Sequence, residues 1–300
     1  MRRIVITGAT GMIGAALAKC AVDKGIEVLC IVRSESKRII NLPKSDLVRT
    51  EFCEISEYDK FAFNGRYDLF FHLAWDKTFG ASRDDVNVQV ANIQHTLDAI
   101  RLAQRLGCRK FIGTGSQAEY GAATVPLGAE TPANPTSGYG VAKYAAGKLG
   151  SLLCSQLSMD FNWVRILSVF GPLDGAQTLI MYTINELKAG RSPELTRCEQ
   201  VWDYLYCDDS AKALLCIGEN GVSGKTYTLG SGCPQRLSIF LELIRDIVAP
   251  DIELRFGEKA YYPHQPMYLS ADITELAHDT GWKPEVSFEV GVRSILSAMK

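Results

Sequence analysis

Three glycines near the start of the sequence constrain its fold more than any other feature. Gly8, Gly11 and Gly14 are spaced three apart in ITGATGMIGAAL, between a β-rich run and a helical pattern. Glycines at these positions provide a tight turn, let the backbone approach a pyrophosphate, and let the helix pack closely on the strand. An ordinary glycine-rich turn is the alternative, but the position between strand and helix favours a dinucleotide site.

Apolar, β-rich runs alternate with helical patterns in the first part of the chain. The runs are RIVITG, EVLCIV, DLFFHLA, RKFIGTG and FNWVRILSVF, and helices are expected at 12–24, 85–106 and from about 139. This alternation is typical of a parallel sheet with helices on both faces, and continuous apolar strands indicate burial on both faces. The expected fold class is therefore α/β, a Rossmann-like doubly wound parallel sheet.

The second part of the chain has a looser pattern. Glycine and proline separate shorter elements at FGPLDG, AGRSPELT and YYPHQP, and KTYTLG at 225–230 again has the pattern of a strand. We therefore expect a dinucleotide-binding Rossmann domain at 1–170, to which the chain returns around 200–230. Residues 171–300 are expected to form mainly a smaller C-terminal substrate-binding lobe.

Composition argues against several classes of protein. The 300 residues include 32 basic and 34 acidic side chains, with a formal charge of −2, so we expect no nucleic-acid partner. No apolar stretch approaches ~18 residues, and glycines and threonines interrupt the N-terminal one, so neither a membrane span nor a signal peptide is expected. Nine cysteines, scattered without C-x-x-C pairs or Cys/His clusters, indicate buried thiols, no metal site and a reducing, cytoplasmic location.

The end of the second expected strand bears on the choice of nicotinamide cofactor. An acidic residue there holds the ribose 2′-hydroxyl of NAD, whereas a nearby arginine suits the 2′-phosphate of NADP. The segment IVRSES has Val32 at the place of the acid and Arg33 after it. We therefore expect a preference for NADP(H), with NAD(H) as the alternative if Arg33 is only a solvated loop charge.

Two tyrosines in SGYGVAKYAAGK each precede a lysine by four residues, as Tyr139 with Lys143 and Tyr144 with Lys148. Residues four apart share a helix face, but the two tyrosines are five apart and point about 140° away from each other. Tyr139 lies in the first turn of its expected helix, near the carboxyl ends of the strands, where such folds bind ligands. We therefore choose Tyr139 and Lys143 as the reactive pair, and expect Tyr144 to pack on the helix surface or on a dimer face.

Taken together, these segments resemble an extended short-chain dehydrogenase/reductase of the NAD-dependent epimerase/dehydratase family. The resemblance spans nearly all of the chain, and it is carried by the glycine turn, FFHLAW, ANIQHT, GTGSQAEYG, YGVAK, RILSVFGP, QVWDYLYCDD, TYTLGSG and TGWKP. It implies an NAD(P)-dependent enzyme in which a tyrosine exchanges a proton with a substrate oxygen, while the nicotinamide exchanges hydride with the carbon that bears it.

The resemblance also implies which residues form the site. Ser116 is expected to bond the reacting oxygen, and Lys143 to favour the phenolate of Tyr139, whose pKa would otherwise be near ~10, and to hold the nicotinamide ribose. The expected cofactor contacts besides Tyr139 and Lys143 are Gly8, Thr10, Gly11, Met12, Ile13, Gly14, Arg33, Glu54, Leu73, Ala74, Trp75 and Asn92. The expected substrate contacts are Ser116, Gln117, Ser168 and Trp202.

Departures from the family pattern narrow the expected reaction. Dehydratases of the family carry an Asp-Glu pair where this chain has Gln117 and Ala118, so 4,6-dehydration is not expected. Trp202 and the segment YYPHQPMY lack two arginines that usually bind the substrate diphosphate. An indole can stack on a base or sugar instead, although core packing is an equal alternative. Gly147 and Ser168 replace residues that are often glutamate and asparagine, which leaves specificity open.

The segments GSQAEYG and EQVWDYLY are closest to those of reductases of nucleotide-activated deoxy-keto-sugars. We therefore expect reduction of a 4-keto-deoxysugar nucleotide. The alternatives are a nucleotide-sugar 4-epimerase, a reductase of a non-nucleotide carbonyl compound, and a non-catalytic NADP(H)-binding sensor. Helices at 85–106 and 139–158 resemble those that pair in dimers of this family, so a homodimer is expected.

Overall fold

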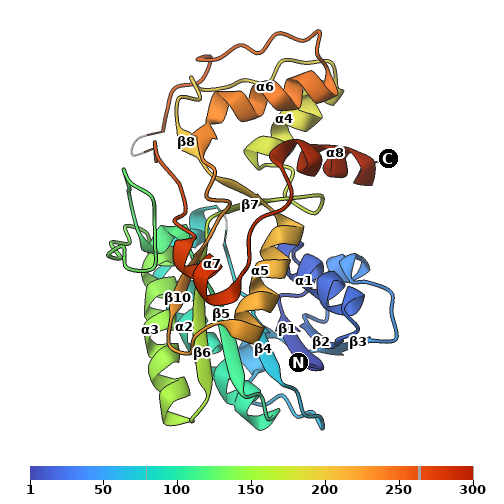
Figure 1. Cartoon of the computed structure of the whole chain (residues 1–300), viewed down its shortest axis with the longest axis vertical. Helices are drawn as coiled ribbons and strands as arrows, with labels where there is room; N and C mark the ends of the chain where they lie inside the picture. Colours follow the sequence, from blue (N-terminus) through green and yellow to red (C-terminus); the bar gives the residue numbers. More distant parts are fainter. Residues whose placement is uncertain (79, 263–264, 300) are drawn as a thin grey trace.

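Seven parallel strands form the central sheet of the computed structural model, which describes residues 1–78, 80–262 and 265–299. The strands are β1 (Arg3–Thr7), β2 (Glu27–Val32), β3 (Val48–Phe52), β4 (Leu69–His72), β5 (Lys110–Ser116), β6 (Asp160–Ile166) and β10 (Thr226–Leu229). Their order across the sheet is β10-β6-β5-β4-β1-β2-β3, and each neighbouring pair is parallel. The expected Rossmann-like parallel sheet is therefore confirmed (Figure 1).

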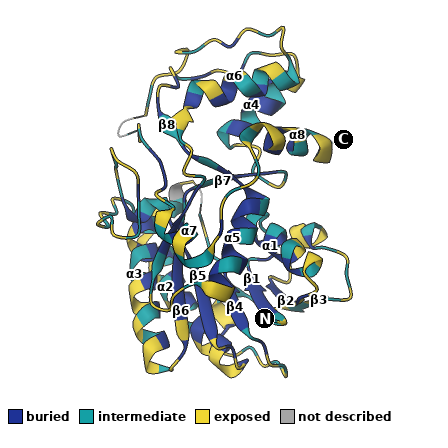
Figure 2. Cartoon of the chain, viewed as in Figure 1, coloured by how far each residue is buried: buried dark blue, intermediate teal, exposed yellow. Residues whose placement is uncertain are grey.

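Helices cover both faces of this sheet. On one face lie α1 (Met12–Asp23), α5 (Cys207–Asn220) and α7 (Thr274–Thr280), and on the other lie α2 (Val86–Arg105) and α3 (Gly138–Gln156). Leu17 of α1 and Leu214 of α5 share a buried cluster with Ile6, whereas Ile100 of α2 and Ala146 of α3 belong to a second cluster. Because both faces are covered, the strands are buried along most of their length, as Figure 2 shows.

A smaller lobe lies at the top of Figure 1. It contains α4 (Leu179–Lys188), α6 (Leu237–Val248), α8 (Phe288–Ala298) and the short strands β7 (Ser168–Phe170), β8 (Val201–Trp202), β9 (Tyr204–Tyr206) and β11 (Gln235–Arg236). Its core is aromatic, with the Phe288 ring 4.8 Å from that of Phe170 and 4.5 Å from that of Phe240, centroid to centroid. The predicted boundary at residue 170 remains a prediction, since α5, β10 and α7 pack with the sheet although they follow it in sequence.

Two strands differ from expectation. The run at 161–170 is not one strand, because β6 ends at Ile166 and β7 begins at Ser168 and pairs with β9 instead. The neighbouring strand β5 ends at Ser116, where the chain turns into the 3-10 helix η4 (Gln117–Glu119), so no partner continues beside the run. Strand β3 was not expected, because its sequence VRTEF lacks a continuous apolar run; it is the half-exposed edge of the sheet.

The cysteines pack as apolar side chains. Six of the nine are buried, two are half-buried and Cys233 is exposed, and all nine are free thiols. Burial raises the pKa of Cys30 and of Cys108 to about 12, so these thiols stay protonated. Within the described residues, no group of three or more His, Cys, Asp or Glu side chains is placed to hold a metal ion. In the same part of the chain, no helix has both the length and the apolar character required to cross a bilayer.

Candidate functional site

The glycine turn after β1 leaves a helix end open to an anion. Gly8 has a φ of +70°, and a Cβ atom there would lie 2.7 Å from the backbone nitrogen of Ala74. A Cβ atom on Gly14 would lie 2.2 Å from the carbonyl oxygen of Gly8, so a side chain does not fit at either place. Gly11 is the N-cap of α1 and provides no side-chain cap. The first N–H groups of α1 therefore remain available for a phosphate group.

A cavity of about 630 Å³ lies over this turn. The expected cofactor residues that line it are Gly8, Thr10, Gly11, Met12, Ile13, Gly14, Arg33, Leu73, Ala74 and Trp75. Arg38, Tyr58 and Asp174 line it as well, and sequence reasoning missed them because loop geometry, rather than a local motif, brings them to the cavity. The size of the cavity, the bare glycine turn and the open helix end fit a nicotinamide dinucleotide.

Four expected cofactor residues do not line the cavity: Tyr139 and Lys143, which are described below, and Glu54 and Asn92. The Glu54 carboxylate accepts hydrogen bonds from the backbone nitrogen and the hydroxyl of Ser34, at 3.1 and 3.0 Å. Asn92 is buried, and its side chain bonds both the backbone nitrogen and the carbonyl oxygen of Asp76, at 2.9 and 3.0 Å. Asp76 itself lines the cavity, so Asn92 supports the cavity wall through this loop. Direct cofactor contacts of Glu54 and Asn92 remain predictions.

Two arginines stand where β2 leaves the sheet. Arg33 follows the strand, and Arg38 lies on the 3-10 helix η1 (Lys37–Asn41). Both are exposed at the rim of the cavity. Side chains of η1 and the residue before it bond the glycine turn: the Ser36 hydroxyl lies 3.3 Å from that of Thr10, and the Asn41 amide donates to the Thr10 carbonyl at 3.0 Å. The positively charged side chains of Arg33 and Arg38 therefore lie next to the glycine turn.

The structure brings Ser116, Tyr139 and Lys143 together. Ser116 ends β5, and Tyr139 lies in the first turn of α3, which Ser137 caps by accepting a hydrogen bond from the Gly140 backbone nitrogen at 3.1 Å. The Tyr139 phenol lies near enough to the Ser116 side chain for Ser116 to lower its pKa. Lys143 is buried one turn further along α3, and its ammonium group donates to the Thr114 carbonyl oxygen at 2.7 Å.

The surroundings of this trio shift its pKa values. Burial raises the pKa of Tyr139, while the Ser116 side chain and the positive charge of Arg83 oppose the rise. The Arg83 guanidinium lies 4.7 Å from the centroid of the Tyr139 ring. Burial lowers the pKa of Lys143 to about 7, and the negative charge of Glu119 opposes this fall. Sequence reasoning identified neither Arg83 nor Glu119, because no residue spacing marks them.

Trp75 connects the cofactor cavity with the trio. Its ring lines the cavity, lies 3.8 Å from the Lys143 ammonium nitrogen, and meets the Tyr139 ring edge-on with centroids 6.0 Å apart. The indole N–H donates to the Gln89 side chain at 3.0 Å, which fixes the ring. Trp75 therefore adjoins both the cofactor cavity and the group of Ser116, Tyr139 and Lys143.

The other tyrosine–lysine pair lies elsewhere on α3. The Lys148 ammonium lies 5.5 Å from the Tyr144 ring centroid, and the Arg165 guanidinium lies 5.9 Å from it. Arg165 belongs to β6, so Tyr144 stands beside this strand, whereas Tyr139 is the tyrosine that interacts with Ser116. The geometry favours Tyr139 as the reactive phenol.

The expected substrate residues beyond Ser116 form two groups. The Trp202 indole N–H donates to the Ser168 hydroxyl at 2.8 Å, so these two side chains meet in the lobe. Gln117 follows Ser116 directly, and its side-chain oxygen is buried without a hydrogen-bond partner. A substrate donor next to the reacting oxygen would satisfy it.

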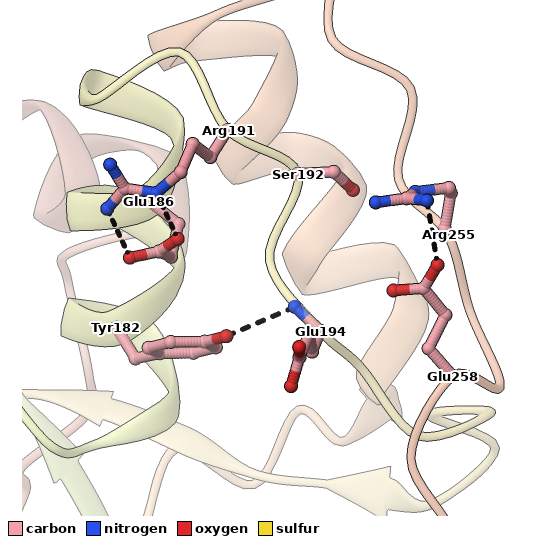
Figure 3. A pocket seen from close by; sticks show the side chains of 7 residues that line it. All are labelled: Tyr182, Glu186, Arg191, Ser192, Glu194, Arg255 and Glu258. Carbon is pink, nitrogen blue, oxygen red and sulfur yellow. Dashed lines mark hydrogen bonds and ion pairs between the residues drawn. The ribbon is translucent and has the colours of Figure 1, made fainter.

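The lobe has a second hollow of about 790 Å³, between the end of α4 and the segment at 255–258 (Figure 3). Its charged groups pair with each other or with a neighbour: Arg191 with Glu186 at 2.8 Å, Arg255 with Glu258 at 3.0 Å, and Glu194 with Lys259 at 3.2 Å. The Tyr182 hydroxyl accepts from the Glu194 backbone nitrogen at 3.1 Å. Because these charges are already matched, the hollow offers no excess charge to a ligand.

Comparison with known proteins agrees with this geometry. Residues 4–230 match the NAD dependent epimerase/dehydratase family. The chain belongs to this family. Among its members, CDP-abequose synthase of Salmonella typhimurium is 24% identical over 309 residues, covering 99% of this chain and 98% of that protein. The dTDP-glucose 4,6-dehydratase of Neisseria meningitidis is 24% identical over 328 residues, covering 98% and 92%.

A solved structure shows the same fold. UDP-N-acetylglucosamine 4-epimerase from Methanobrevibacter ruminantium, in complex with UDP-N-acetylmuramic acid, superposes with a TM-score of 0.88 at 22% identity. The match covers 99% of this chain and 98% of that one. Since members of the family catalyse several reactions, the fold alone does not choose between them.

Proposed function

We propose that this chain reduces the 4-keto group of a nucleotide-activated deoxysugar with NADPH. The observation that carries the proposal is the grouping of Tyr139 beside Ser116, with Lys143 one turn further along α3 and Trp75 of the glycine-turn cavity 3.8 Å from its ammonium nitrogen. Bound NADPH supplies hydride to the carbonyl carbon. Tyr139 donates its proton to the carbonyl oxygen, which Ser116 holds by a hydrogen bond, and the Lys143 ammonium stabilises the phenolate that remains. Solvent then returns a proton to Tyr139.

The residues after β5 support reduction rather than dehydration. Gln117 and Ala118 provide no acid to expel a hydroxyl group, although both lie beside Ser116. The 24% identical CDP-abequose synthase supports a nucleotide-activated deoxysugar as substrate. In the lobe, Trp202 and Ser168 are proposed to contact it, with the indole against a base or sugar face. The second candidate is 4-epimerisation, which the epimerase relative favours and which uses the same trio.

The deciding experiment follows NADPH absorbance with a panel of 4-keto-sugar nucleotides and simple ketones. Consumption of one NADPH per sugar nucleotide converted supports the proposal. Conversion without net consumption identifies an epimerase, which returns its hydride to the substrate. Consumption only with ketones identifies a reductase of non-nucleotide carbonyl compounds. Tight NADPH binding without any conversion identifies a sensor.

The two arginines at the cavity rim predict a preference for NADP(H), with NAD(H), the cofactor of the family's description, as the alternative. Arg33→Ala is expected to weaken NADPH binding about tenfold or more, since a hydrogen bond to a charged group is worth about 1.5–3 kcal/mol. Binding of NADH is expected to stay unchanged, because it has no 2′-phosphate. Calorimetric titration of both cofactors, with Arg38→Ala in parallel, measures this. Equal or tighter binding of NADH by the unaltered chain reverses the choice.

Apolar side chains on the outer faces of α2 and α3 support a homodimer. Val90 on α2 is 57% exposed, and Val141 and Leu152 on α3 are 52% and 63% exposed. The two helices pack against each other, and Val141 and Leu152, eleven residues apart on α3, share one face of that helix. Leu152→Glu is expected to convert a dimer to a monomer, measured by light scattering on a sizing column, whereas Val222→Glu, which lies outside both helices, should leave the mass unchanged. A wild-type monomer at micromolar concentration contradicts the proposal.

A further inference from the structure

A buried carboxylate lies directly behind the end of β5. Glu119, on η4, is fully buried, and it accepts hydrogen bonds from the Ser116 backbone nitrogen at 2.8 Å, the Trp163 indole at 3.0 Å and the Arg165 guanidinium at 2.8 Å. The Arg165 side chain is only 6% exposed. Buried ion pairs are seldom the most stable way to fill a core, so this one suggests a further role.

Two glycines leave the space that this network occupies. A Cβ atom on Gly115 would lie 2.2 Å from the Glu119 carboxylate and 2.4 Å from the Trp163 indole nitrogen. A Cβ atom on Gly147 would lie 2.8 Å from the Trp163 ring. Gly147 follows Lys143 by one turn of α3, so the indole and the carboxylate support the same helix face that carries this lysine.

We propose that Glu119 is a positioning residue of the site: it fixes the backbone of Ser116 and provides the negative charge that holds the Lys143 ammonium in place. The inference rests on the proposed function, in which Ser116 binds the reacting oxygen. The carboxylate acts through these two neighbours and does not touch the substrate.

Glu119 is connected to Lys143 through one ring: the Lys143 ammonium nitrogen lies 6.0 Å from the Trp163 ring centroid, and the Trp163 indole N–H donates to the Glu119 carboxylate. Tyr139 precedes the lysine on α3, and its ring centroid lies 5.8 Å from the Lys143 ammonium nitrogen and 4.7 Å from the Arg83 guanidinium. His72, on β4, is neutral because burial lowers its pKa to about 3. Among the described residues, Glu119 is the acid that acts on Lys143, and its charge raises the pKa that burial lowers. Without it, the lysine loses its proton at a lower pH.

Two variants separate the two roles. Glu119→Gln combined with Arg165→Met removes both buried charges but keeps an amide oxygen for the Ser116 nitrogen. In this double variant, Lys143 is expected to titrate at a lower pH, as measured by NMR of lysine-labelled protein without substrate. Glu119→Asp keeps the charge but is one methylene shorter, so Lys143 should titrate as in the wild type. Because the shorter carboxylate cannot reach Ser116 while it pairs with Arg165, kcat should fall about tenfold to 10²-fold with unchanged KM.

A matched control is Lys110→Met at the opposite end of β5. The Lys110 ammonium group is buried and donates to the carbonyl oxygens of Ile217 and Gly221, so its loss lowers stability without reaching the trio. Its Lys143 titration and kcat should match the wild type.

Wild-type kcat in Glu119→Asp, together with wild-type titration in the double variant, overturns the proposal. If the double variant does not fold, kcat of Glu119→Asp decides alone. The titration of Lys143 is measured without substrate, so it can be read even if the proposed substrate class is wrong. Failure of this inference can therefore be distinguished from failure of the proposed function.

Discussion

Replacing Tyr139 by phenylalanine is expected to lower kcat by about 10²-fold or more, the usual scale for loss of a general acid or base. The substitution removes only the hydroxyl group near Ser116, and it keeps the ring that packs against Trp75 and Arg83. Ser116 then remains at the substrate oxygen as a hydrogen-bond donor, but its alkyl hydroxyl is a much weaker acid than the phenol that has been removed. Because the cofactor cavity does not include the Tyr139 hydroxyl, the affinity for NADPH should stay within about twofold of the wild type.

The matched control for this prediction is Tyr144→Phe. Its ring lies on the same helix and also has a lysine four residues later, but it stands beside Lys148 and Arg165. Steady-state NADPH oxidation should therefore be unchanged in this variant. A loss of less than tenfold in Tyr139→Phe would show that the wrong tyrosine has been assigned.

Lys143→Met is expected to lower kcat by about 10²-fold and to change the pH profile. Burial lowers the pKa of Lys143 to about 7, so the ammonium is charged below this pH and neutral above it. Burial raises the pKa of Tyr139, so the phenol keeps its proton over the same range. In the wild type, kcat/KM for reduction should therefore fall as the pH rises through about 7, because the charge that stabilises the phenolate is lost.

The variant tests this assignment directly. Methionine has no proton to lose, so the fall of kcat/KM through neutral pH should be absent from its profile, and the remaining rate should be flat there. Binding of NADPH is measured separately, because the resemblance gives the lysine a contact with the nicotinamide ribose. If Lys143→Met keeps the alkaline fall of the wild type, another group causes it.

The sequence predicted those parts of the fold in which one strong local signal agrees with the tertiary structure. Strands β1, β4 and β5 are continuous apolar runs, and they are buried on both faces. Strand β3 was missed because it lies at the edge of the sheet, where none of its five side chains is fully buried and the sequence has no apolar run. The separation of β6 from β7 at Leu167 was missed because the sequence is apolar both before and after this residue. The position of the break is set by the neighbouring strand β5, which ends at Ser116 and leaves β6 without a partner beyond Ile166.

The candidate site divides in the same way. Local sequence motifs predicted the glycine turn, Ser116, Tyr139 and Lys143. The turn lines the cofactor cavity, and the other three residues lie next to one another, beside Trp75 of that cavity. Arg38, Arg83 and Glu119 have no such motif, because a loop or a short 3-10 helix brings each of them to its place. The proposed effect of Glu119 on Lys143 depends on the burial of the carboxylate, because in the core water does not screen its charge.

The position of β10 at the sheet edge has a consequence for synthesis of the chain. Until Thr226–Leu229 has been translated, the outer edge of β6 has no partner, although Trp163 and Val164 are already present. A nascent chain or a fragment ending near residue 170 thus presents unpaired backbone groups beside apolar side chains, which is the arrangement that promotes association between chains. Only the first part of the lobe, with α4, β8 and β9, is translated during this interval, because β11, α6 and α8 follow β10 in the sequence.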